Sequence, residues 1–350
     1  MAEDVVLQSA SPNGNAEAVV EDDGRAVYLY QHFAEGTGQE LRATWVRNRV
    51  AAPPGVMMDD MQHGLAPLMP ARFCAHPEGQ PRLDPTRTRL VWLPDGNGVA
   101  LYEGPELLAC TAPWHGVDDC PGYARDVTQD SPFAWRFEPT SPLAERFKAA
   151  ERFWDSWQSK LSWEQVRKGL RDALGRALGR ETSHREDALA WPPLGIATFE
   201  SERGLTTATV GMSQRPMPAV ELAHADAASR FRRVELAVML PHGAPELLRE
   251  RMGGFLTLAS ELPWGRYSWL GHGHTIPVDA FKDTPYSGVV LASSDRLGPA
   301  VPLPPVDGDP VTLLWLVPVT TAEVQAVRGE GVDAFLSTVT QPRALAEVKA

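Results

Sequence analysis

The chain has 350 residues, of which 43% are hydrophobic and 22% are charged, and its formal net charge at pH 7 is −12. This length exceeds one ordinary hydrophobic core and predicts two domains, and the composition is typical of a globular protein. A net-acidic protein repels phosphate backbones, which argues against sequence-independent nucleic-acid binding.

No apolar run approaches the ~20 residues that a membrane span needs, and we expect no membrane partner. The first ten residues, MAEDVVLQSA, carry acidic groups where a secretory signal carries Lys or Arg. We therefore expect a cytoplasmic protein. Cys74, Cys110 and Cys120 form no CxxC pair, and their odd number predicts buried free thiols rather than disulfides.

The charge is distributed unevenly along the chain. Residues 1–145 carry a net charge of −11 and contain no Lys, residues 146–187 carry +3, and residues 188–350 carry −4. An acidic N-terminal part favours a cationic partner, although acidity also simply keeps a protein soluble.

Residues 1–140 are predicted to form a β-rich, acidic domain. Short runs of aromatic and β-branched residues predict strands at residues 26–30, 41–46, 89–93 and 99–102. The sequence PDGNG at residues 94–98 is a strong turn signal, so residues 89–110 are predicted to form a three-stranded meander.

Residues 141–187 are predicted to form a helical pair between the two domains. Ser141 and Pro142 suit a helix start, and apolar residues then recur at helical spacing to residue 161. Ser162 and Gln165 predict a capping box that opens a second helix, which ends near Gly179. Residues 181–187 are polar without an apolar period and are the predicted domain boundary.

Residues 188–350 are predicted to form an α+β domain. Strands are expected at residues 195–200, 205–212, 234–240, 269–278, 286–292 and 311–319, with a helix starting at Pro245. The strands and helices do not alternate regularly, which favours a mixed β-sheet with packed helices over a doubly wound fold. Thr320 and Glu323 predict a capping box after the last, continuously apolar strand.

Four motifs in this part of the chain occur in a characteristic order. Residues 209–213 read TVGMS, residues 233–236 read RVEL, residues 273–277 read GHTIP, and residues 311–336 read VTLLWLVPVTTAEVQAVRGEGVDAFL. Together they make residues 191–345 resemble a suppressor-of-fused domain. The resemblance implies the fold of that family, and residues 1–187 have no such resemblance.

The resemblance also implies a non-enzymatic protein that binds another protein and needs no cofactor. Bacterial members resemble immunity proteins that bind and neutralise a polymorphic toxin domain, and this is our leading hypothesis. Animal relatives bind a transcription-factor peptide, largely by adding its strand to a sheet edge. A regulatory adaptor without a toxin partner is one alternative.

A small metal-dependent hydrolase is the second alternative, with His272 and His274 as ligands. Residues two apart on a strand point to the same face, a common spacing for zinc ligands, and Asp279 and Asp283 could supply a carboxylate. The glycines at 271 and 273 suggest a turn instead. A metal site needs three or four ligands, so we expect none here.

The predicted partner-binding residues are Trp264, Tyr267, Trp269, His272 and His274. The three aromatic residues lie within six positions, on a predicted loop beside Pro263 and Gly265, and exposed Trp and Tyr are frequent interface anchors. No GxSxG, HExxH or Gly-rich phosphate loop is present. Glu235, on an apolar strand, is expected to bond a backbone donor or Arg233 rather than to act as a catalyst.

Overall fold

The computed structural model describes residues 4–186, 193–278 and 285–339, and the chain forms two compact units. Unit 1 comprises Met1–Ser156 with Trp264–Tyr267, and unit 2 comprises Trp157–Pro263 with Ser268–Ala350. Among these described residues, no helix has the length and apolar character that crossing a membrane requires.

Unit 1 contains two β-sheets. The first is an antiparallel four-stranded meander in chain order, made of β1 (Asp4–Ala10), β2 (Ala16–Asp22), β3 (Ala26–Phe33) and β4 (Arg42–Asn48). The second has five strands in chain order, β5 (Thr88–Trp92), β6 (Val99–Glu103), β7 (Glu106–Cys110), β8 (Tyr123–Ala124) and β9 (Trp135–Arg136). The meander predicted for residues 89–110 is therefore confirmed as β5, β6 and β7.

Both sheets of unit 1 contribute to one core. Leu29 and Trp45 from the first sheet and Leu101 from the second are fully buried in it. The helix α2 (Pro142–Trp157) covers the second sheet, because its Leu143 and Phe147 pack in a separate cluster with residues of β5, β6 and β7. A five-residue helix, α1 (Met58–Gln62), lies in the long connection between the sheets. All three cysteines are free and buried.

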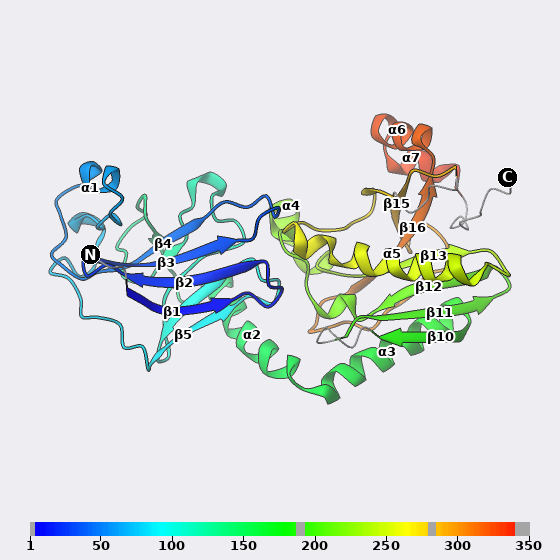
Figure 1. Ribbon diagram of the computed structural model, residues 1–350, viewed down its shortest axis with the longest axis horizontal. Coiled ribbons are helices and arrows are strands. Elements are labelled where there is room, and N and C mark those ends of the chain that lie inside the picture. Colours follow the sequence, from blue (N-terminus) through cyan, green and yellow to red (C-terminus); the bar gives the residue numbers. More distant parts are fainter. Residues whose placement is uncertain (1–3, 187–192, 279–284, 340–350) are drawn as a thin grey trace. The chain divides into compact units, whose positions relative to one another are not determined.

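Unit 2 is built on a seven-stranded mixed sheet with the order β10-β11-β12-β13-β16-β15-β14 (Figure 1). Its strands are β10 (Arg180–Glu186), β11 (Gly195–Ser201), β12 (Gly204–Val210), β13 (Arg233–Leu240), β14 (Thr275–Pro277), β15 (Gly288–Ser293) and β16 (Val311–Val319). Only β13 and β16 pair in parallel, since all other neighbours are antiparallel.

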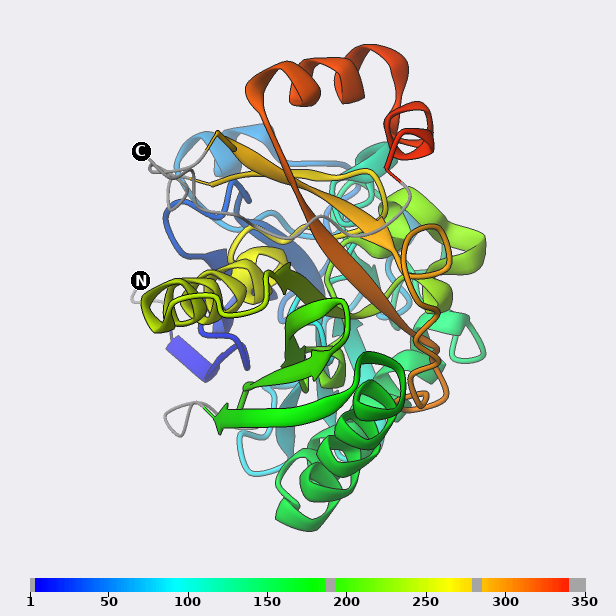
Figure 2. The same ribbon diagram turned by 90° about the vertical axis from the view of Figure 1, so that its right-hand side faces the viewer.

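Helices cover both faces of this sheet. α3 (Lys160–Leu178) packs Leu170, Leu174 and Leu178 against Phe199 of β11, and α5 (Glu246–Gly265) lies on the opposite face (Figures 1 and 2). The remaining helices are α4 (Val220–His224), α6 (Thr321–Glu330), α7 (Val332–Ser337) and the 3₁₀ turns Ala71–Phe73, Val117–Asp119, Met212–Gln214 and Ala225–Arg230. The fold of unit 2 is therefore α+β, as the sequence predicts.

Several local predictions are confirmed and others need correction. Thr320 and Glu323 form the predicted capping box at the start of α6. Ser159, rather than Ser162, caps α3, because its hydroxyl accepts the Ser162 backbone N–H at 3.4 Å. The polar stretch predicted to connect two domains is strand β10, paired along its length with β11. The strand predicted for residues 269–278 is only the three-residue β14.

Acid is expected to destabilise unit 1 through His115. Burial, and then the charge of Arg42, lower the pKa of His115 from 6.5 to about 4. The unfolded state therefore binds more protons than the folded state between pH 6.5 and pH 4. The free energy of unfolding consequently decreases as the pH falls through this range. The shift corresponds to about 3 kcal/mol. In chemical denaturation from pH 7 to pH 4, the free energy of unfolding should decrease less for His115→Gln than for wild type. The matched control is the exposed residue His63, and His63→Gln should follow wild type. Equal slopes for wild type and His115→Gln would contradict this.

Candidate partner-binding site

Trp269 lies at the centre of an aromatic cluster on unit 2. Its ring is 4.4 Å from the ring of His274 and 4.7 Å, edge-on, from the ring of His224, measured between centroids. His224 in turn stacks on Phe231 at 4.0 Å. We call His224, Phe231, Trp269 and His274 the aromatic cluster. It brings together two predicted residues, Trp269 and His274, with two that lie about forty positions earlier in the chain.

The aromatic cluster is partly open to solvent. Phe231 keeps 37% of its surface exposed, Leu222 of α4 keeps 52%, and the other three rings are half-buried. Aromatic rings with an apolar body and a polar edge are the side chains most enriched in binding hot spots. Burial is the main cause that lowers the pKa of His274, and the nearby His224 lowers it further. His274 is therefore held in its neutral form, which suits a stacking role.

Trp264 and Tyr267 lie elsewhere. Trp264 is the penultimate residue of helix α5 and Tyr267 follows the helix, and both are buried in unit 1, at 2% and 4% exposure. Tyr267 packs edge-on against Phe33 at 5.1 Å. The prediction that these two rings are exposed on a loop is wrong, because packing large aromatic surfaces outweighed the local Pro and Gly signals. They do not join the aromatic cluster.

His272 and His274 do not share a strand face. His272 and Gly273 form a turn before β14, with Gly273 at φ +89°, as the flanking glycines suggested. The His272 ring accepts the Ser293 backbone N–H at 3.2 Å and lies 3.3 Å from an Asp333 carboxylate oxygen. Asp279 and Asp283 lie outside the described residues. Within the described ranges, no group of three His, Cys, Asp or Glu side chains could hold a metal ion.

Glu235 is fully buried and holds a turn in place. Its carboxylate accepts four hydrogen bonds, from the Thr209 hydroxyl at 2.5 Å, the Gly211 N–H at 3.0 Å, and the Ser213 N–H and hydroxyl at 3.0 and 2.6 Å. Burial is the largest influence and raises the pKa of Glu235, while these hydrogen bonds oppose the rise. The expectation that Glu235 bonds backbone donors is confirmed.

Arg233 anchors the same turn from its other side. It donates to the Ser213 and Gln214 carbonyls at 3.0 and 2.8 Å and pairs with Asp307 and Asp309. The TVGMS and RVEL motifs are therefore two halves of one buried polar network. Their distinctive residues specify the fold of unit 2, and they do not form a binding surface.

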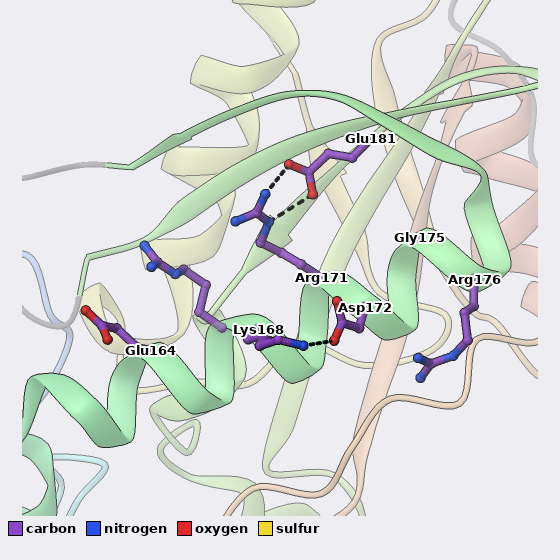
Figure 3. Close-up of a pocket in the computed structure, with 8 residues that line it drawn as sticks. Glu164, Lys168, Arg171, Asp172, Gly175, Arg176 and Glu181 are labelled. Atoms are coloured by element: carbon purple, nitrogen blue, oxygen red, sulfur yellow. Dashed lines mark hydrogen bonds and ion pairs between the residues drawn. The ribbon is translucent and has the colours of Figure 1, made fainter.

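A charged groove of about 760 Å³ runs between α3 and β10 (Figure 3). Arg171 donates two hydrogen bonds to Glu181, and Lys168 pairs with Asp172 at 2.6 Å. Arg171 and Lys168 are thus matched by acidic partners within the chain, so neither presents an unpaired charge to a ligand. We do not place the partner-binding site there.

The aromatic cluster was only partly predictable. The sequence signal for Trp269 and His274 is their closeness to glycine and to other aromatic residues. His224 and Phe231 lie on short helical turns between β12 and β13, with no apolar period around them. Their approach to Trp269 depends on the tertiary fold, which no local pattern reports.

Comparison with known proteins finds one family over most of unit 2. The suppressor-of-fused family model matches residues 190–346. A solved structure described as the Sufu–Fu complex shares 16% identity with a TM-score of 0.34, covering 51% of this chain and 91% of its own. No curated protein matches the chain. The matched segment contains the Glu235 network and the whole aromatic cluster, and the family consists of non-enzymatic protein-binding domains. Residues 190–346 of this chain therefore form a domain of the suppressor-of-fused family.

Proposed function

We propose that the protein is a bacterial, cytoplasmic immunity protein that neutralises a polymorphic toxin by binding one of its domains. The observation that carries this proposal is the family match over residues 190–346. The toxin as partner rests on the resemblance of these motifs to bacterial members of the family. The aromatic cluster is the proposed anchor surface, with Trp269 at its centre.

The partner is proposed to contact side chains rather than to extend the sheet. Edge strands invite pairing unless charges, bulges, short length or proline protect them. In the described sheet, β10 carries four charged residues and a bulge after Glu181, and β14 is three residues long and ends at Pro277. Both edges are thus protected, which departs from the strand addition that the animal relatives suggest.

The net charge supports a cationic partner. At −12, the chain attracts positively charged proteins over a Debye length of about 8 Å at physiological salt. Raising the salt concentration should therefore lower the association rate more than it raises the dissociation rate.

Removing an aromatic ring from the cluster should change the dissociation rate rather than the association rate. Trp269→Ala removes the ring that contacts both histidines, and loss of a hot-spot aromatic costs about 2 kcal/mol, or roughly thirtyfold in Kd, mainly through faster dissociation. The measurement is surface plasmon resonance against the purified product of the neighbouring toxin gene that this proposal predicts. Leu161→Ala, an exposed apolar residue on α3 outside the cluster, is the matched control.

Two outcomes of the binding measurement would contradict parts of this proposal. Unchanged dissociation for Trp269→Ala and Phe231→Ala, in variants that melt like wild type, would remove the aromatic cluster as the anchor. No binding of the wild-type protein to the neighbouring product would remove the toxin partner and favour the adaptor alternative.

A further inference from the structure

Exposed methionines gather at one place in unit 1. Met57, Met58 and Met61 keep 42%, 58% and 39% of their surfaces exposed. All other methionines within the described residues are buried, namely Met69, Met212, Met217, Met239 and Met252. Single exposed apolar residues are ordinary, but a contiguous group calls for an explanation.

The three residues occupy one turn of helix α1. Met57 is its N-cap, and the Met61 N–H donates to the Met57 carbonyl at 3.4 Å. Side chains three and four positions apart are neighbours on a helix, with about 5–6 Å between their Cβ atoms. Met58 and Met61 have this spacing within the helix, and Met57, at the N-cap, lies four positions before Met61, so the three positions stand close together on one turn. No residue of α1 is buried, so this turn does not serve the core.

Contacts of other residues hold the turn in place. Asp60 pairs with Arg25 in the turn between β2 and β3, and the Leu65 N–H donates to the Asp60 carbonyl at 3.0 Å. The His63 Nδ1 lies 2.7 Å from the Asp59 carbonyl. The helix is therefore anchored through its acidic side, while the methionine side chains, with three rotatable bonds each, remain free to converge.

We propose that Met57, Met58 and Met61 form a thioether site for a soft monovalent cation, Cu(I), with Ag(I) as its chemical analogue. Uncharged thioether sulfur is a soft donor that selects Cu(I) over Zn²⁺, Mg²⁺ or Ca²⁺. The exposed Asp59 carboxylate in the same turn favours a cation. The three cysteine thiols, which are also soft ligands, do not compete for the ion because all of them are buried. This site lies outside the suppressor-of-fused domain and is independent of the proposed function.

The test is titration of the full-length, untagged protein with Ag(I) in chloride-free buffer, followed by calorimetry and by the methionine ε-methyl NMR signals. Wild type should bind one equivalent, with shifts in three ε-methyl signals. The triple variant Met57→Leu, Met58→Leu, Met61→Leu keeps the apolar patch but removes its sulfur, so it should lose that equivalent. Met69→Leu, a buried and volume-conserving change, should retain it.

Competition for Cu(I) with bicinchoninate under anaerobic conditions should show the same difference between wild type and the triple variant. Equal Ag(I) uptake by these two proteins would overturn the proposal, since the metal would then bind elsewhere. No Zn²⁺ uptake is expected from either protein, and Zn²⁺ binding lost in the triple variant would also contradict a soft thioether site.

Discussion

Replacing Gly211 with alanine is expected to destabilise unit 2 by about 3 kcal/mol or more. Gly211 has φ +103°, where a side chain is strained, and an added Cβ would lie 2.2 Å from the Cη2 atom of Trp163. Trp163 is a buried residue of α3, so no flexible group can give way. The measurement is the free energy of unfolding by urea, followed by tryptophan fluorescence and circular dichroism.

Gly254 offers a matched control. It lies inside helix α5, and a Cβ added there meets no atom within 4 Å. Gly254→Ala should therefore stabilise the protein by up to about 1 kcal/mol, through helix propensity alone. In a Trp163→Ala background, the cost of Gly211→Ala should shrink, because the clashing ring is gone. Equal costs in both backgrounds would show that Trp163 does not set the constraint at Gly211.

Glu235→Ala is expected to cost about 3–5 kcal/mol, comparable to breaking a buried charge network. The change leaves the Thr209 and Ser213 hydroxyls and two backbone N–H groups without their common acceptor. It also releases the turn that Arg233 holds from the other side. Differential scanning calorimetry should show a large fall in Tm. Because the site is buried, added salt should restore little of the lost Tm.

A catalytic role for Glu235 predicts a different outcome. Substituting a catalytic carboxylate abolishes activity but changes stability little. Substituting a structural carboxylate lowers the stability of the fold. Glu235→Gln separates the two, because the amide keeps one acceptor oxygen but turns its NH₂ toward donors. We expect it to be less stable than wild type and more stable than Glu235→Ala. A fully stable Glu235→Gln protein would contradict the structural role.

Local signals in the sequence predicted the parts of unit 2 that local physics determines. The hairpin of β11 and β12 has alternating residues around a Gly turn, and β16 with α6 has an apolar run and a capping box. Strand β10 could not be found this way. Its sequence, RETSHRE, has no apolar alternation, because the strand is held by backbone pairing to β11 and by ion pairs to α3.

The candidate site was predictable only in part, for a related reason. Trp269 could be proposed as an interface residue from its type and its neighbours. The burial of Trp264 and Tyr267 could not, since it depends on unit 1, whose residues are distant in the sequence. The approach of His224 and Phe231 to Trp269 is likewise a product of the fold. The three exposed methionines, in contrast, lie within five positions of one another in the sequence, but only their accessibility distinguishes them from core residues.

The most direct test of the proposed function is a neutralisation titration of the toxin domain that the proposal predicts to be encoded beside this gene. A non-enzymatic binding protein should abolish the toxin's activity at a fixed ratio of protein to toxin, independent of incubation time, and the complex should be isolable. The Trp269→Ala protein should need a higher concentration to reach the same inhibition. Complete inactivation at a small fraction of one equivalent, increasing with time, would show turnover and contradict the account.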